Sequence, residues 1–129
     1  MVTYYLIDTS IASKYLDGFL SEKGFDFMDS VFELESNISI ITKIELLSWV
    51  TEEKSLYQKI EIFAEDSIIY PLSDEIASRT IELRRKYKLK TPDAIIAATA
   101  LVNKLTLLTD NERDFKAIKG LKISNPNRL

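Results

Sequence analysis

The feature that most constrains the fold is a repeated alternation of short apolar runs with longer stretches of helical periodicity. Runs of strand type occur at residues 2–7, 38–41, 67–72, 105–109 and 121–124. Neither a Gly/Pro-rich linker nor an internal repeat interrupts the order. Strands that alternate with helices form parallel sheets covered on both faces and joined by right-handed crossovers. The sequence therefore predicts a three-layer α/β fold with a central, mostly parallel sheet of four to five strands.

Local signals predict where several helices begin. Asp8-Thr9-Ser10 directly follows the first apolar run and predicts a helix that is capped by Thr9 or Ser10 and ends near Gly18. Thr42-x-x-Glu45 and Ser55-x-x-Gln58 fit the capping-box pattern of two further helices. Thr91-Pro92-Asp93 places Pro at the first helical position and predicts a helix through the Ala-rich stretch 94–102.

Length and composition indicate one globular domain over residues 1–129. The chain has 129 residues, of which 46% are hydrophobic and 29% charged, in the range of a compact core. The longest uncharged run, residues 94–103, is far shorter than the roughly 20 residues that span a membrane. The start MVTYYLID lacks the pattern of a secretory signal. We therefore expect a cytoplasmic protein that does not enter a membrane.

The chain contains neither Cys nor His. Their absence excludes thiol nucleophiles, Ser/His/Asp triads, and zinc sites built from thiolate or imidazole. A Walker-type phosphate loop is excluded too, because the three glycines, Gly18, Gly24 and Gly120, are isolated. Chemistry at neutral pH must then come from carboxylates, Lys, Tyr, hydroxyls or a cation held by oxygen.

Acidic residues follow the predicted strands. Asp8 and Asp110 end the first and fourth apolar runs, while Glu45 and Asp93 lie in the first turns of predicted helices. Parallel sheets bind ligands beyond the carboxyl ends of their strands, so we expect these four side chains to share one rim. Each also has a structural explanation: Glu45 in a capping box, Asp93 at a helix N-terminus, Asp8 in an Asx cap, and Asp110 in a polar loop.

Carboxylates gathered at one rim repel one another unless a cation neutralises them. Oxygen ligands without His or Cys favour Mg²⁺ or Mn²⁺ over zinc or copper. Such an ion activates water and neutralises phosphoryl charge, so the chemistry that fits best is hydrolysis of a phosphodiester.

Four segments carry a resemblance to a known family. They are LIDTS at residues 6–10, TKIEL at 42–46, KTPDAIIAATA at 90–100 and LLTDNERDF at 107–115. In order and spacing they resemble the PIN-domain ribonucleases, and in particular the VapC-type toxins of bacterial toxin–antitoxin pairs. The resemblance covers essentially the whole chain and implies a PIN-like fold.

The resemblance implies that Asp8, Glu45 and Asp93 bind one or two Mg²⁺ or Mn²⁺ ions. The fourth position falls on Asp110, Asn111 or Asp114, and the motif leaves the choice among them open. Three further polar residues are implied to support the site: Thr9, Ser10 and Asn111. The resemblance further implies a homodimer, a small antitoxin protein that inhibits it, and structured RNA as the substrate.

Charge is distributed unevenly along the chain. Residues 1–78 carry 5 basic and 15 acidic residues, a net charge of −10, and residues 79–129 carry 12 and 5, a net charge of +7. The densest basic stretch leads into Asp93, and its Arg84, Arg85 and Lys86 are candidates for guiding an RNA backbone. The acidic, aromatic-rich first half favours a basic partner. The resemblance to VapC-type toxins implies that the helices of roughly residues 20–65 form a groove for an amphipathic antitoxin helix.

Three other functions make different demands on the sequence. A haloacid-dehalogenase-like phosphatase needs a second acid two residues after Asp8, where this chain has Ser10. A phospho-acceptor receiver domain needs an acid after a middle strand, but the third run ends in Tyr70-Pro71-Leu72. A non-catalytic α/β interaction module with incidental acids predicts that no divalent cation binds.

Overall fold

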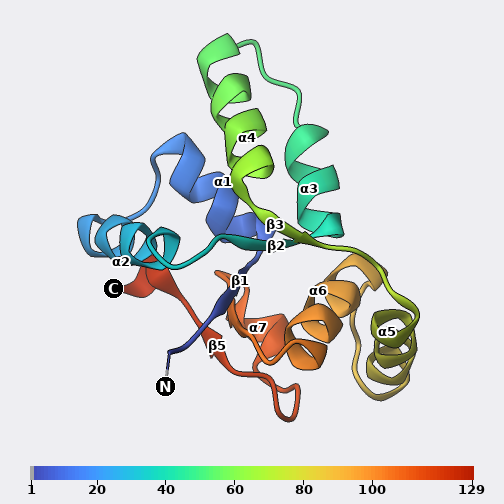
Figure 1. Cartoon of the computed structure of the whole chain (residues 1–129). Helices are drawn as coiled ribbons and strands as arrows, with labels where there is room; N and C mark the ends of the chain where they lie inside the picture. Colours follow the sequence, from blue (N-terminus) through green and yellow to red (C-terminus); the bar gives the residue numbers. More distant parts are fainter. Residues whose placement is uncertain (1) are drawn as a thin grey trace.

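The computed structural model describes residues 2–129 (Figure 1). The strands are β1 (Tyr5–Ile7), β2 (Asn37–Ser39), β3 (Ile68–Tyr70), β4 (Thr106–Leu108) and β5 (Ile123–Ser124). The helices are α1 (Thr9–Asp17), α2 (Glu22–Phe32), α3 (Ile40–Leu47), α4 (Lys54–Asp66), α5 (Asp74–Lys86), α6 (Thr91–Val102) and α7 (Glu112–Phe115), and a 3-10 turn, η1 (Pro126–Arg128), follows β5.

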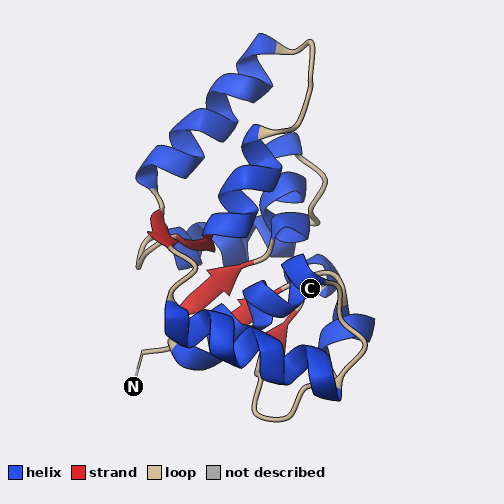
Figure 2. Ribbon diagram, turned by 90° about the vertical axis from the view of Figure 1, so that its right-hand side faces the viewer, coloured by secondary structure: helices blue, strands red, loops and turns tan. Residues whose placement is uncertain are grey.

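The five strands form one sheet in the order β3-β2-β1-β4-β5, and every neighbouring pair is parallel. Figure 2 shows the strands in the middle of the molecule with helices on both sides. The prediction of a three-layer fold with a parallel sheet of four to five strands is confirmed. The order also brings the first and fourth strands together, with Ile7 opposite Leu108.

Two buried clusters cover the two faces of the sheet. Leu6 and Leu107 belong to the cluster formed with α5, α6 and Phe115 of α7. Ile7 and Leu108 belong to the other, formed mainly with α1, α2 and α4. Neighbouring residues on one strand thus face opposite helical layers, as the two-residue period of a strand requires. Strands buried on both faces read as continuous apolar runs, which is why the runs were recognisable.

Several predicted helix starts were wrong by one to three residues. Asp8, rather than Thr9 or Ser10, caps α1 and accepts a hydrogen bond from Thr9 N. Ser39 caps α3, so Thr42 and Glu45 lie inside the helix and form no capping box. Helix α4 starts at Lys54 and its N-cap makes no side-chain hydrogen bond. The predicted starts of α1 and α3 fail because a polar residue at the end of a buried strand caps the next helix directly.

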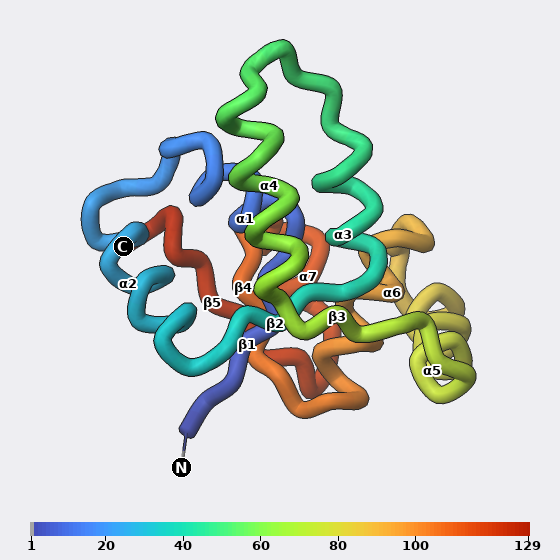
Figure 3. Tube along the Cα trace, turned by 45° about the horizontal axis from the view of Figure 1, so that its top comes forward, coloured from blue at the N-terminus to red at the C-terminus, as the bar shows by residue number. Residues whose placement is uncertain are grey.

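Helices α1 and α3 each begin at the residue after a strand, or one residue later, so their N-terminal turns lie at the carboxyl rim of the sheet. Helix α3 contacts both α1 and α6, as Figure 3 also shows. Segments that are far apart in sequence therefore meet beside the ends of β1 and β4. In residues 2–129, no helix is long and apolar enough to cross a membrane.

Candidate active site

Asp8 lies at the end of β1 and is only 6% exposed. Its carboxylate accepts hydrogen bonds from Thr9 N (2.8 Å), Ser10 Oγ (3.2 Å) and Thr109 Oγ1 (2.7 Å). Burial raises the pKa of Asp8 above its usual value, the three hydrogen bonds oppose that shift, and the nearby charge of Glu45 adds to it. Among the described residues, no basic side chain forms an ion pair with Asp8. Its carboxylate is therefore held in place and is suited to bind a metal cation.

Glu45 projects from α3 toward the start of α1. Thr9 Oγ1 donates a hydrogen bond of 2.6 Å to Glu45 Oε1 and lies 3.0 Å from Thr42 Oγ1. Thr42 is fully buried, so its hydroxyl holds the side chain of Thr9 in a fixed position. Glu45 itself is exposed, which leaves its carboxylate accessible to solvent and ligand.

Asp93, in the first turn of α6, reveals how the acids are arranged. Burial raises its pKa, and the charges of Asp8, Asp114 and Glu45 raise it further, while Lys90 lowers it. These four carboxyl groups come from four separate segments, and Asp93 lies within electrostatic range of the other three. Asp8 and Glu45 are also linked directly, because both accept a hydrogen bond from Thr9.

Asp110 and Asp114 have different surroundings. Asp110 pairs with Lys14 Nζ and accepts hydrogen bonds from the side-chain amides of Asn125 (3.2 Å) and Asn127 (3.4 Å). Asp114 is exposed and accepts a 2.9 Å hydrogen bond from Asn111 Nδ2. Of these two acids, only Asp114 is among the charges that raise the pKa of Asp93. Asp110 is instead held by Lys14 and the two asparagines.

The sequence analysis missed two residues that support the site. Thr109, fully buried at the end of β4, donates to Asp8 and accepts a hydrogen bond from Asn111 N (3.0 Å). Lys14 lies one helical turn after Ser10, whose Oγ accepts a bond from Asp110 N. A polar residue that ends an apolar strand run was the signal for Thr109, but nothing in the sequence pairs Lys14 with Asp110.

The donor set fits a hard divalent cation. All candidate ligands are oxygen atoms, and the mutual repulsion that raises the pKa of Asp93 is the effect that a cation removes. Among residues 2–129, no three acidic side chains are close enough to form a complete cation site on their own. Mg²⁺ does not need such a cage, because it binds one or two carboxylates and completes its shell with water and phosphate oxygens.

The basic stretch at the end of α5 is exposed at Arg84, Arg85 and Lys86. Arg84 is partly engaged, since its Nε donates to the carbonyl of Leu89 at 3.2 Å. Lys86 Nζ lies 5.7 Å from the centre of the Tyr87 ring. The side chain with a direct electrostatic effect on the acids is Lys90, which lowers the pKa of Asp93.

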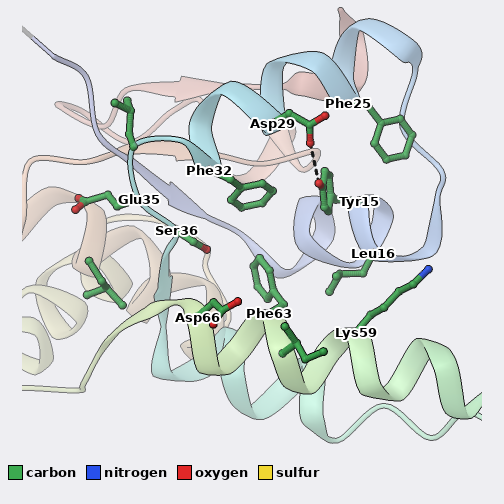
Figure 4. A pocket seen from close by; sticks show the side chains of 13 residues that line it. Tyr15, Leu16, Phe25, Asp29, Phe32, Glu35, Ser36, Lys59, Phe63 and Asp66 are labelled. Carbon is green, nitrogen blue, oxygen red and sulfur yellow. Dashed lines mark hydrogen bonds between the residues drawn. The ribbon is translucent and has the colours of Figure 1, made fainter.

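A groove of about 1000 Å³ lies on the other helical layer, between α1, α2 and α4. Figure 4 shows Phe25, Phe32 and Phe63 along it, with the Tyr15 hydroxyl donating to Asp29 at 2.8 Å. Burial and that carboxylate raise the pKa of Tyr15 to about 12. Phe32 packs edge to face against both Tyr15 and Phe63, so aromatic rings from α1, α2 and α4 contact one another along the groove.

The family model of the PIN domain matches residues 5–121. The chain belongs to the PIN domain family. This assignment confirms the family resemblance found in the four sequence segments and decides against a haloacid-dehalogenase-like phosphatase and a receiver domain.

Solved structures agree with the PIN assignment. The chain superimposes on a toxin–antitoxin complex from Klebsiella pneumoniae with a TM-score of 0.77 and 31% identity, covering 95% of this chain and 97% of that one. The match to VapBC2 from Rickettsia felis, bound to a promoter DNA fragment, has a TM-score of 0.82 and 23% identity and covers 95% of this chain and 98% of that one. The match to DNA-bound VapBC from Salmonella typhimurium has a TM-score of 0.81 and 20% identity and covers 97% of this chain and 99% of that one. Comparison with curated proteins gives no match. The resemblance to VapC-type PIN proteins is confirmed.

Proposed function

We propose that this PIN domain protein is an endoribonuclease that uses Mg²⁺ or Mn²⁺ to hydrolyse RNA phosphodiesters, and that it is the toxin of a type II toxin–antitoxin pair. The observation that supports the proposal is that Asp8 and Glu45 both accept hydrogen bonds from Thr9, while Asp93 is close enough to Asp8, Glu45 and Asp114 for their charges to raise its pKa. An inert α/β module has no reason to collect like charges, because their repulsion destabilises the fold.

Each acid has a distinct part in this proposal. Asp8 and Asp93 hold the cation, and Asp114 rather than Asp110 supplies the fourth carboxylate. Glu45 is held toward the site by Thr9 and is free to bind the cation or its water. Bound Mg²⁺ or Mn²⁺ supplies a water of lowered pKa and neutralises charge on the phosphoryl group.

The hydroxyls around Asp8 act as positioning residues. Ser10 and Thr109 both donate to Asp8 Oδ2, so they hold one oxygen in place and leave Oδ1 with the backbone bond from Thr9. Asp110 acts through Ser10 and Lys14, since it ties α1 to the loop after β4. In this proposal the network keeps Asp8 in one orientation before a cation binds.

Cleavage of a labelled structured RNA in Mg²⁺, Mn²⁺ or EDTA tests the activity. We expect cleavage in either metal and none in EDTA, and we expect Asp93→Asn to abolish it. Asp26→Asn is the matched control, because Asp26 is an exposed aspartate on α2 without a hydrogen bond to the site. Metal-dependent cleavage that survives Asp93→Asn would contradict the proposed site.

For the partner, we propose that an amphipathic helix of a small antitoxin occupies the groove between α1, α2 and α4. The residues that line this groove include Asp29 and Asp66, whose negative charges favour a basic helix. Ile62→Glu places a charge on the groove wall, where Ile62 is 58% exposed, and we expect it to abolish binding of the co-expressed neighbouring small protein. Ile81→Glu on α5, 54% exposed and outside the groove, is the control.

We also propose that the basic end of α5 guides the RNA backbone. Neutralising Arg84, Arg85 and Lys86 together is expected to weaken RNA binding and to reduce its dependence on salt. Unchanged binding and salt dependence would identify these residues as an ordinary solvated helix face. A homodimer remains a prediction, and sedimentation of the purified protein would test it.

A further inference from the structure

A polar cleft of about 680 Å³ lies along α7, beside the acidic cluster of Asp8, Glu45, Asp93 and Asp114. It is lined by Asp110, Asn111, Glu112, Arg113, Asp114, Lys116 and Arg128. Hydrogen bonds connect the cleft to Asp8: Asp110 N donates to Ser10 Oγ and Asn111 N donates to Thr109 Oγ1, and both hydroxyls donate to the Asp8 carboxylate. A ligand in this cleft therefore lies close to Asp8.

The charges in the cleft are not balanced by one another. Asp110 is paired with Lys14, and Glu112 with Arg128 at 3.1 Å. In residues 2–129, neither Arg113 nor Lys116 makes an ion pair with an acidic side chain. The acids other than Asp114 are thus neutralised within the protein, while two cations remain available to an external anion.

These two cations are also suitably placed to act together. Arg113 lies in α7 and Lys116 follows three residues later with helical backbone, so both side chains leave the same side of the turn. Both are exposed, and the buried Phe115 between them anchors the turn in the core. The turn is therefore fixed, while the two charged ends point to solvent.

Positive charge also lies next to Asp93. Lys90 is the N-cap residue of α6, three residues before Asp93 in the first turn of the helix. An anionic chain that reaches the acidic cluster with a cation bound can contact Lys90 as well as Arg113 and Lys116. Repeated negative charges along one flexible chain are the property of a nucleic-acid backbone, whereas a single carboxylate could satisfy only one of these positions.

We propose that the cleft of Arg113 and Lys116 binds a backbone phosphate of the RNA, next to the phosphodiester that is cut. This inference rests on the proposed nuclease function and adds a substrate subsite to it. Arg113 contributes a planar donor fork that fits phosphate oxygens, and Lys116 a point charge beside it. The subsite fixes which phosphate reaches the acids without reading the base.

The test is RNA binding by the full-length chain carrying Asp93→Asn, which prevents cleavage during the measurement. The probe is a fluorescent single-stranded RNA, titrated in Mg²⁺ over a series of salt concentrations. Two double variants are compared. One carries Arg113→Gln and Lys116→Gln, and the control carries Lys23→Gln and Lys54→Gln. Both pairs remove two exposed positive charges, but the control residues lie on α2 and α4, away from the acids.

We expect the Arg113/Lys116 variant to bind RNA at least tenfold more weakly and to lower the slope of log K against log salt by about 0.7, which is the contribution of one phosphate contact on a single strand. The control pair is expected to change the slope by less than half as much. In the chain with Asp93 intact, the same variant should raise KM for RNA while changing kcat little.

Equal slopes for the two variants overturn the subsite. So does a result in which the Arg113/Lys116 variant loses the co-expressed small partner but binds RNA normally, because the cleft then binds protein. If RNA is cleaved in a metal-dependent manner while the slopes are equal, only this inference fails. If the unsubstituted chain neither cleaves nor binds RNA, the inference and the proposed function fail together. Circular dichroism confirms that each variant is folded.

Discussion

Thr109→Val tests the hydrogen-bond network that holds Asp8. The substitution preserves shape, because Val and Thr differ by one methyl for one hydroxyl, but it removes the 2.7 Å bond to the Asp8 carboxylate. Thr109 is fully buried and Asp8 is 6% exposed, so water cannot replace the lost donor freely. The amide of Asn111 also loses its acceptor.

The expected cost follows from these contacts. A hydrogen bond to a charged group contributes about 1.5–3 kcal/mol, so the free energy of unfolding should fall by about that amount at neutral pH without metal. For 129 residues, an unfolding entropy of about 2.1 cal/mol/K per residue converts 1 kcal/mol to about 4 °C, and the melting temperature should fall by about 6–12 °C.

The cost should also depend on pH. Burial raises the folded-state pKa of Asp8, and the bond from Thr109 opposes that shift, so Thr109→Val raises the pKa further. A carboxyl with a raised folded pKa contributes stability below its unfolded pKa, and that stability is lost as the pH rises through the folded value. The difference between variant and parent should therefore be largest at neutral pH and shrink in acid, where Asp8 is protonated in both.

Thermal and urea unfolding in EDTA at several pH values provide the measurement. Thr106→Val is the matched control, since Thr106 begins β4, the strand that Thr109 directly follows, and its side chain makes no hydrogen bond within the described residues. A loss below about 0.5 kcal/mol at neutral pH, or equal effects of the two substitutions, would refute the role assigned to Thr109.

Further predictions concern the metal, the acids and the C-terminal packing. Mn²⁺ at about 100 times its Kd should stabilise the fold by about 2.7 kcal/mol, or roughly 10 °C in melting temperature, and differential scanning fluorimetry should show that Asp93→Asn removes this shift. Without metal, Asp93→Asn should be more stable than the parent at pH 7, because the folded pKa of Asp93 is raised, and the difference should vanish below pH 4. Gly24→Ala should cost about 1–3 kcal/mol in urea unfolding, because its Cβ would lie 2.7 Å from the Pro126 carbonyl oxygen.

The sequence determined the order of strands and helices, and with it the fold class. The apolar runs ending at Ile7 and Leu108 predicted strands, because strands buried on both faces carry few polar residues. Helix α6 was equally predictable, since Pro92 and the Ala-rich stretch give a strong local signal. The positions of Asp8, Glu45 and Asp93 after strands or in first turns were also visible, because the carboxyl rim of a parallel sheet is fixed by topology.

Only the tertiary structure shows which acids influence one another and which hydroxyls hold them. Asp110 and Asp114 are four residues apart, and the motif could not separate them. In the folded chain their surroundings differ, because Lys14, from a helix about a hundred residues earlier, pairs with Asp110, while the charge of Asp114 raises the pKa of Asp93. Likewise, Thr109 reaches Asp8 only because β4 lies beside β1 in the sheet. Local sequence encodes where a chain turns and where a helix is capped. The pKa of a carboxyl group, in contrast, depends on neighbouring charges and hydrogen bonds that only the folded chain brings close.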